Sequence, residues 1–233
     1  HLVLLAKNKT GYTNLCRLST LSYLEGFYYR PRLDTKTIAK HSEGLICLTA
    51  CIAGSIPQAI IKEDEAELRR IISHYRSIFG KDLYFEIMDH GIEEEDKVNH
   101  VLADITYEYS IPVVATNDIH YMSNADAEAQ ATLMAVNTGG RRWQIKNGLL
   151  VSYRDEKTFE LSGDKSYHLR TEKEMATNFS WWHEGTDTLL SRSQEIADSV
   201  EEYDISFGKM VIPSFALPIP GMSSKDMLTA LCE

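Results

Sequence analysis

The sequence predicts an α/β fold built around a parallel sheet that is buried on both faces. Four short and nearly continuous apolar runs lie in the first half of the chain, as expected for strands of such a sheet. Longer segments with an apolar residue at every third or fourth position separate these runs, which is the pattern of amphipathic helices. With 233 residues, of which 43% are apolar, the chain has enough material for one sizeable core.

The first predicted strand covers residues 1–7. A helix over residues 12–24 follows it and carries leucines at helical spacing. Asp34 or Thr35 then caps a short helix that ends at Gly44. This part of the chain is therefore expected to supply one strand and two helices.

Residues 45–50 form the second predicted strand, and a short helix follows Pro57. The strongest helical pattern of the chain covers residues 63–79. The third strand covers residues 83–88. These segments predict a strand–helix–strand unit with parallel strands.

The next helix, over residues 93–109, begins with the acidic run 93–96, which favours the helix dipole and is interpreted as structural. The fourth strand covers residues 112–115. Ser123 then caps a helix that continues to residue 137.

The strand–helix alternation weakens after residue 140. We expect a hairpin around residues 149–153, a capping box formed by Thr171 and Glu174, and a helix over residues 186–200. The chain is expected to divide into a first domain, residues 1–205, and a terminal region, residues 206–233. That region contains three of the six prolines and is interpreted as a linker followed by the start of another helix.

Composition excludes several classes of protein. A net charge of −10 gives no overall basic surface for nucleic acid, although a bound metal cluster can still attract phosphate. No run of about 18 apolar residues is present, so no membrane span is expected. Four scattered cysteines favour a reducing cytoplasm over a disulfide scaffold. Because the chain starts with His1 in a strand-like segment, we expect a fragment of a longer protein.

Chemistry-bearing residues follow two of the predicted strands. Right-handed crossovers between parallel strands bring all their C-terminal ends to one face, where α/β folds carry out their chemistry. Cys51 follows the second strand, and Asp118 and His120 follow the fourth. We therefore expect these three side chains to share one edge of the sheet.

Asp118 and His120 allow two interpretations. Side chains at positions i and i+2 of an extended segment point the same way, so both can face one cavity and bind a metal ion. In the alternative, Asp118 caps the following turn and His120 packs as a partly buried imidazole. Spacing alone favours the turn, because this pattern is common by chance.

Four further residues are weaker candidates. Cys51 is either a metal ligand or a small buried hydrophobe, whereas Cys47, about 13 Å away along a strand, is assigned to the core. His1 heads its strand and alone carries no signal. Glu86 and His90 lie at the end of the third strand, where they either join the site or form a turn.

Five phrases occur in a fixed order along residues 1–139. They are HLVLLAKNKTGYTNLCRLSTLSYLEGFYYRPRLD, GLICLTACIAGSIPQ, FEIMDHG, IPVVATNDIHY and DAEAQATLMAVNTG. Their order and spacing resemble those of the polymerase-and-histidinol-phosphatase (PHP) domain of bacterial DNA polymerase III alpha subunits. The phrases HLRTEKEM and LSRSQEIADSVEEYDISFGK resemble the exit of that domain towards the palm. Residues 141–167 match less well and are interpreted as an insertion.

The resemblance implies a distorted, TIM-like (β/α)7 barrel whose C-terminal face holds up to three divalent metal ions, zinc or manganese, under nine ligands. Four of these ligands match His1, Cys51, Asp118 and His120, and Asp118 and His120 are implied as the catalytic pair. The other five, among them an H-x-H pair, belong to a segment that would precede residue 1. We therefore expect a barrel that is incomplete at its N-terminus.

The resemblance also implies a role in DNA replication as part of a DNA-directed DNA polymerase, a nucleotidyltransferase whose palm would lie beyond residue 233. PHP domains that keep their ligands act as metal-dependent 3′–5′ exonucleases that proofread. Those that have lost ligands serve as scaffolds, sometimes for a separate exonuclease subunit. All four testable positions keep ligand-competent residues, so we expect an active phosphoesterase, with the inactive scaffold as the alternative.

The partners implied by the resemblance are primer–template DNA, a sliding clamp and an exonuclease subunit, in the cytoplasm and without a membrane. A free-standing PHP phosphatase for small molecules is a third interpretation. The phrase GFYYRPR and the proline-rich exit favour the polymerase over that phosphatase.

Overall fold

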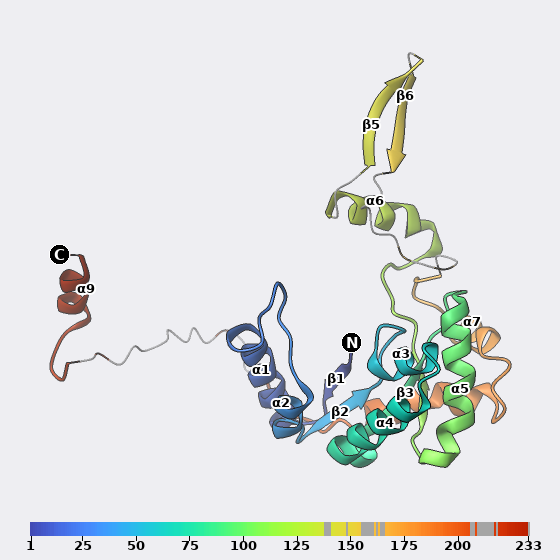
Figure 1. The fold of residues 1–233 in the computed structure, drawn as a ribbon, viewed down its shortest axis with the longest axis horizontal. Helices are drawn as coiled ribbons and strands as arrows, with labels where there is room; N and C mark the ends of the chain where they lie inside the picture. The colour runs from blue at the N-terminus through green and yellow to red at the C-terminus, as the bar shows by residue number, and fades with distance from the viewer. Residues whose placement is uncertain are drawn as a thin grey trace. The chain divides into compact units, whose positions relative to one another are not determined.

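The computed structural model describes residues 1–137, 141–147, 149–154, 161, 163, 166–205, 208, 217 and 219–232, and for the two strands within residues 141–154 it describes the backbone alone. The chain divides into two compact units, residues 1–202 and residues 203–233. The first unit contains a four-stranded sheet and the helices that cover it (Figure 1).

The sheet has the strand order β1-β2-β3-β4, which is also the order along the chain. The strands are β1 (Val3–Ala6), β2 (Leu45–Leu48), β3 (Leu83–Ile87) and β4 (Val113–Ala115). β2, β3 and β4 are parallel to one another, as the sequence predicts. The described residues thus form a mixed α/β fold, and closure into a seven-stranded barrel stays a prediction.

β1 corrects the expectation of an all-parallel sheet, because it pairs antiparallel with β2. Two helices, α1 (Lys9–Leu24) and α2 (Thr35–Lys40), connect these strands. A connection between parallel strands usually contains a single helix, which returns the chain to the end of the sheet where the first strand began. α1 carries the chain back along the sheet and α2 returns it to the end where β1 finished. There the backbone N–H of Lys7 donates to the carbonyl of Gly44 at 2.8 Å.

Both faces of the sheet are buried, as predicted. One face carries Leu45, Cys47, Phe85 and Val113, which pack with the apolar stripes of the covering helices in the larger core cluster. These helices are α3 (Ser55–Ile61), α4 (Glu65–Phe79) and α5 (Glu93–Tyr109). Figure 1 shows α4 and α5 beside the sheet strands β2 and β3.

The opposite face has a smaller apolar cluster. Ile46 and Leu48 of β2 and Val114 of β4 meet Ile196 there. Ile196 belongs to α8 (Thr186–Asp198), which lies against β4. Successive side chains of β2 point to opposite faces of the sheet, so they pack alternately in the two clusters.

The remaining described elements agree with the local sequence signals. Ser123 forms a capping box with Asp126 at the 3₁₀ turn Asn124–Asp126, which precedes α6 (Ala127–Asn137). β5 (Arg141–Lys146) and β6 (Leu149–Arg154) form the predicted hairpin, with Arg141 opposite Arg154. Thr171 and Glu174 form the predicted capping box of α7 (Glu172–Asn178), and a second 3₁₀ turn, Gly80–Asp82, precedes β3.

In the second unit, α9 (Ser224–Cys232) is the predicted terminal helix. Most of the proline-rich segment lies outside the described residues, so the division at residue 205 stays a prediction. None of the helices in the described part of the chain is long and apolar enough to cross a membrane.

Candidate metal centre

Four chain segments meet at one edge of the sheet, called here the C-terminal edge because the parallel strands β2, β3 and β4 end there. β1 runs in the opposite direction, so its N-terminal end lies at the same edge. His1 therefore reaches this edge by preceding its strand, whereas Cys51, Asp118 and His120 reach it by following theirs.

His1 and Cys51 form the first pair of donor side chains. The His1 Nδ1 atom lies 3.4 Å from the Cys51 Sγ atom. His1 is exposed and Cys51 is half-buried, so the pair is open to solvent on one side. The backbone turns sharply before Cys51, because Ala50 has a φ of +63°, which is why β2 ends at Leu48 and not at residue 50.

Asp118 and His120 form the second pair. The Asp118 Oδ2 atom lies 3.4 Å from the His120 Nε2 atom, and both side chains are partly exposed. The expectation that an extended segment aligns them is wrong, because Asp118 has a φ of +42°. The pair is held instead by Tyr167, whose carbonyl accepts from the His120 backbone N–H at 2.8 Å.

Both pairs have the spacing of two ligands on one cation. Zinc bonds of about 2.0–2.3 Å in a tetrahedral site place neighbouring donor atoms about 3.4–3.6 Å apart. The two observed separations of 3.4 Å agree with this value. Within the described residues, however, no three His, Cys, Asp or Glu side chains converge on one point. Each pair therefore offers two donor atoms at a spacing that suits one cation, and a complete coordination shell would need donors from other groups.

Glu86 connects the two pairs. Its carboxylate accepts from the Ala50 backbone N–H at 2.8 Å and from the Thr116 hydroxyl at 2.7 Å. Ala50 precedes Cys51, and Thr116 lies two residues before Asp118. Burial raises the pKa of Glu86, the hydrogen bonds from Thr116 and Ala50 oppose this rise, and the charge of Asp118 adds to it. Glu86 is therefore a positioning residue beneath both pairs.

His90 is buried and has hydrogen-bond acceptors at both ring nitrogens. The Glu95 carboxylate lies 3.0 Å from Nδ1, and the Asn117 carbonyl oxygen lies 3.0 Å from Nε2. An acceptor at each nitrogen favours the imidazolium form of the ring, because only that form offers two N–H groups. Burial alone lowers the pKa of His90, but the hydrogen bonds to Glu95 and Asn117 outweigh it and raise the pKa.

Tyr167 joins His90 to His120. Its ring stacks on His90 with centroids 4.0 Å apart and meets the His120 ring edge-on at 5.5 Å. The Asn117 amide nitrogen donates to the His168 carbonyl, while the buried Asn117 Oδ1 has no hydrogen-bond partner among the described residues. This unsatisfied oxygen, next to Asp118, suits a site that takes up a further polar group.

Several residues that position the candidate ligands cannot be predicted from the sequence. Thr49, whose hydroxyl accepts from the Glu86 backbone N–H at 2.8 Å, has no local signal. The same holds for Thr116 and Tyr167, because all three roles depend on contacts between distant segments. The sequence predicts a purely structural role for the acidic run 93–96, whereas in the structure Glu95 is also the hydrogen-bond partner of His90. Cys47 is a buried core residue, as predicted, and burial raises the pKa of its thiol.

The chain is similar to one known domain family and to several named proteins. Residues 1–90 match the family described as "PHP domain". The chain is 36% identical over 219 residues to the DNA polymerase III subunit alpha of Borreliella burgdorferi, covering 94% of this chain and 18% of that protein. It is 39% identical over 226 residues to the Thermus aquaticus protein of the same name, covering 94% of this chain and 17% of that protein.

A third relative, the DNA polymerase III subunit alpha of Treponema pallidum, is 45% identical over 143 residues, which cover 61% of this chain and 12% of that protein. The chain thus spans less than a fifth of the length of these curated relatives. With its first 90 residues matched to the domain family and most of its length to these polymerase subunits, the chain carries a PHP domain of the DNA polymerase III alpha subunit type.

Proposed function

We propose that the C-terminal edge of the sheet is a metal-dependent phosphoesterase centre that removes nucleotides from the 3′ end of DNA. The observation that carries the proposal is the presence of two donor pairs, His1–Cys51 and Asp118–His120, each with a 3.4 Å separation at one edge of the sheet. The first three strands of this sheet lie within residues 1–90, which match the PHP domain family. Removal of a mispaired terminal nucleotide there would be proofreading.

The proposed centre belongs to a distorted (β/α)7 barrel. The sequential strand order β1-β2-β3-β4 supports this architecture, because neighbouring strands of a barrel follow one another along the chain. Each pair supplies two donors, and segments that complete the barrel would bring the remaining ligands for up to three ions.

The donor types favour zinc or manganese. A thiolate and an imidazole at His1–Cys51 suit zinc, and a carboxylate with an imidazole at Asp118–His120 suits either ion. If these residues hold a divalent ion, it would supply a water ligand of lowered pKa and positive charge beside a phosphodiester. The residues of the chain contribute the geometry: Glu86 fixes the turns that carry Cys51 and Asp118, and Tyr167 holds His120.

The wider proposal concerns the protein in which this domain works. We infer that this protein carries out template-directed DNA synthesis in replication, and relatives named DNA polymerase III subunit alpha support this inference. Primer–template DNA, a sliding clamp and an exonuclease subunit are its proposed partners, in the cytoplasm. The many-fold greater length of these relatives leaves room for a separate polymerase site.

A second candidate function is an inactive scaffold that stabilises the polymerase and binds an exonuclease subunit. One observation favours it: no three ligand side chains converge within the described residues. The two candidates differ in whether the intact protein binds metal at Cys51 and Asp118.

The test uses the full-length protein, prepared anaerobically and loaded with zinc or manganese. Bound metal is measured by mass spectrometry, and digestion is followed on 3′-labelled DNA. Cys51→Ser and Asp118→Asn should each lower metal affinity and digestion by at least about tenfold, because each removes a ligand. Cys16→Ser is the matched control, since Cys16 is also a free thiol but lies exposed on α1.

Primer extension by the same variants should stay unchanged, which separates this centre from the polymerase site. A full-length protein that binds no metal, or that digests DNA equally well with Asp118→Asn, would exclude the phosphoesterase and favour the scaffold.

A further inference from the structure

The connection between α1 and α2 exposes an unusual set of aromatic side chains. The segment Gly26–Arg32, called here the aromatic loop, has the sequence GFYYRPR. The exposed fractions of Phe27, Tyr28 and Tyr29 are 57%, 64% and 81%. Large apolar rings in a row at such exposure mark a binding surface more often than an ordinary loop.

The aromatic loop has a defined backbone. Gly26 and Arg32 approach so closely that a Cβ on Gly26 would lie 1.9 Å from the Arg32 carbonyl oxygen. The Tyr28 backbone N–H donates to the Arg30 carbonyl at 3.1 Å. Tyr29 has a φ of +59°, which is strained for an aromatic residue and is found mainly where function requires it. The loop therefore presents its rings in a fixed arrangement.

The rings are paired with each other and with a guanidinium. The Tyr28 and Tyr29 rings meet edge to face with centroids 4.6 Å apart, and the Arg32 guanidinium lies 5.5 Å from the Tyr28 ring centroid. Behind them, Tyr23 and Phe27 stack with centroids 6.3 Å apart. The Tyr28 and Tyr29 rings still leave most of their surface to solvent.

The charge of the aromatic loop is opposite to that of the chain. The loop carries Arg30 and Arg32 and no carboxylate, although the whole chain has a net charge of −10. Across the part of the chain that the structure describes, neither guanidinium forms an ion pair. A ligand that offers negative charge and flat apolar surface together fits this loop.

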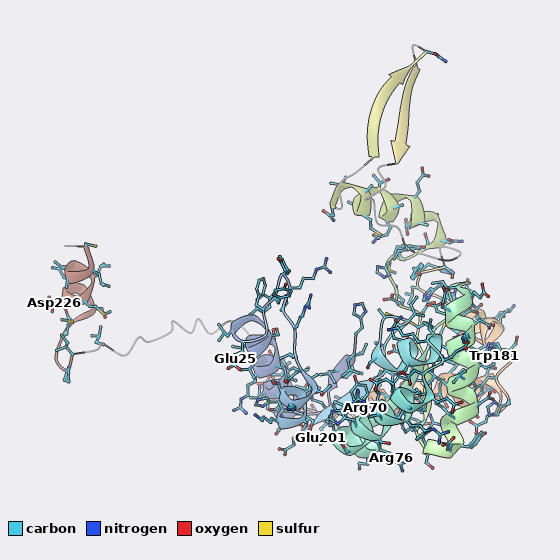
Figure 2. All side chains as sticks on the ribbon, in the orientation of Figure 1. Glu25, Arg70, Arg76, Trp181, Glu201 and Asp226 are labelled. Atoms are coloured by element: carbon cyan, nitrogen blue, oxygen red, sulfur yellow. The ribbon has the colours of Figure 1, made fainter. Side chains whose placement is uncertain are left out.

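The loop lies at the same edge of the sheet as the candidate metal centre. α1 starts beyond the far end of β1 and runs back towards the C-terminal edge. Its 16 residues span about 24 Å, whereas the four residues of β1 span about 14 Å, so the loop stands beyond that edge. Figure 1 shows the connection between α1 and α2 on the side of the sheet where the N-terminus lies, and Figure 2 shows Glu25 at the base of this connection.

We propose that the aromatic loop binds a single strand of DNA and guides its 3′ end to the candidate metal centre. The Tyr28 and Tyr29 rings stack on bases, and Arg30 and Arg32 contact the phosphates. Proteins that bind single strands without sequence preference combine these two kinds of contact. A protein partner would have to supply carboxylates for both arginines, whereas a nucleic-acid strand carries a phosphate beside every base. This inference rests on the proposed action of the centre on DNA.

The test locates the strand on the full-length protein by cross-linking. Single-stranded DNA with 5-iododeoxyuridine near its 3′ end is irradiated with the protein in EDTA, so that binding is measured without metal-dependent digestion. Mass spectrometry of the peptides should place a cross-link on Tyr28 or Tyr29. The cross-link should vanish in Tyr28→Ala/Tyr29→Ala and persist in Tyr107→Ala, which removes a similarly exposed tyrosine from α5.

Affinity provides the second measurement, by fluorescence anisotropy of the same strand in EDTA. The double tyrosine variant should bind at least about fivefold more weakly, because stacking on even one base is lost. Arg30→Gln and Arg32→Gln should each reduce the slope of log affinity against log salt by about 0.7, whereas Arg69→Gln, on the exposed side of α4, should leave it unchanged.

Three results would overturn the inference. The first is cross-links elsewhere in the protein with none in the loop. The second is unchanged affinity and salt slope in all loop variants. The third is protection of Tyr28 and Tyr29 from acetylation in the absence of DNA, which would mean that a protein segment covers the loop. Asp118→Asn should not alter these EDTA measurements, so a failed metal centre and a failed DNA loop give different outcomes.

Discussion

At the scale of single residues, the buried carboxylate of Glu86 has the widest structural influence at the C-terminal edge. It is 5% exposed and accepts hydrogen bonds from two segments that each lead to a candidate ligand. Its own backbone N–H donates to the Thr49 hydroxyl at 2.8 Å, so all three parallel strands are linked here.

Replacement of Glu86 should therefore destabilise the chain. Glu86→Ala leaves the buried Ala50 N–H and the partly buried Thr116 hydroxyl without their acceptor, which should lower the free energy of unfolding by about 2–4 kcal/mol. Glu86→Gln keeps one acceptor oxygen and should lower it by about half as much. Urea unfolding measures both, with Glu94→Ala as the control, because Glu94 is exposed on α5. Equal stability of all three variants would contradict the positioning role.

His90 predicts a pH dependence of stability. Its pKa is raised in the folded chain, whereas in the unfolded chain it is about 6.5. The folded state therefore holds its proton more tightly, and this contribution to stability is complete below about pH 6.5. It is lost as the pH rises through the folded pKa, because the imidazolium bonds to Glu95 and Asn117 can no longer both form.

The measurement is the free energy of unfolding between pH 6 and pH 9 for the native chain and for His90→Gln. The native chain should lose stability relative to the variant as the pH rises, since the variant has no proton to release. A constant difference over that range would show that His90 does not titrate there.

At the scale of elements, the antiparallel β1 decides whether His1 reaches the site. The start of α1 packs on the start of β2 so closely that a Cβ on Gly11 would lie 1.8 Å from the Gly44 carbonyl oxygen. This contact fixes the direction in which α1 leaves β1. A parallel β1 would have carried His1 to the far edge of the sheet, away from Cys51.

Gly11→Ala should therefore destabilise the chain by about 1–3 kcal/mol, although alanine is the better helix former. The cause is the clash with Gly44, which neither backbone can avoid without shifting. Thr10→Ala, one residue earlier and exposed, should change the free energy of unfolding by no more than about 0.5 kcal/mol. Thermal or urea unfolding of both variants distinguishes the clash from helix propensity, which predicts stabilisation by Gly11→Ala.

At the scale of the whole molecule, the net negative charge limits DNA binding to surfaces that carry local positive charge. A chain with a net charge of −10 repels DNA over most of its surface, so binding requires local positive charge. The aromatic loop supplies it with Arg30 and Arg32, and metal ions at the C-terminal edge would supply more.

Local patterns made most of the fold predictable. The stripe of α4, the apolar runs of β2, β3 and β4, and the capping box of Thr171 with Glu174 all depend on residues within a few positions of one another. Such signals are present in the sequence because helix and strand periodicity act locally. The positions of Cys51, Asp118 and His120 at strand ends followed from the same patterns.

The remaining features depend on contacts between distant segments. Neither the direction of β1 nor the bond from Ala50 to Glu86 has a local signal, because each depends on how two elements pack. The same holds for His90, which packs between Glu95, Asn117 and Tyr167. The sequence by itself predicted four candidate ligands, His1, Cys51, Asp118 and His120, and the strands beside which they lie. Only the tertiary structure decided which of them form pairs, because donor atoms must approach within a few ångströms and the packing of the whole sheet sets that distance.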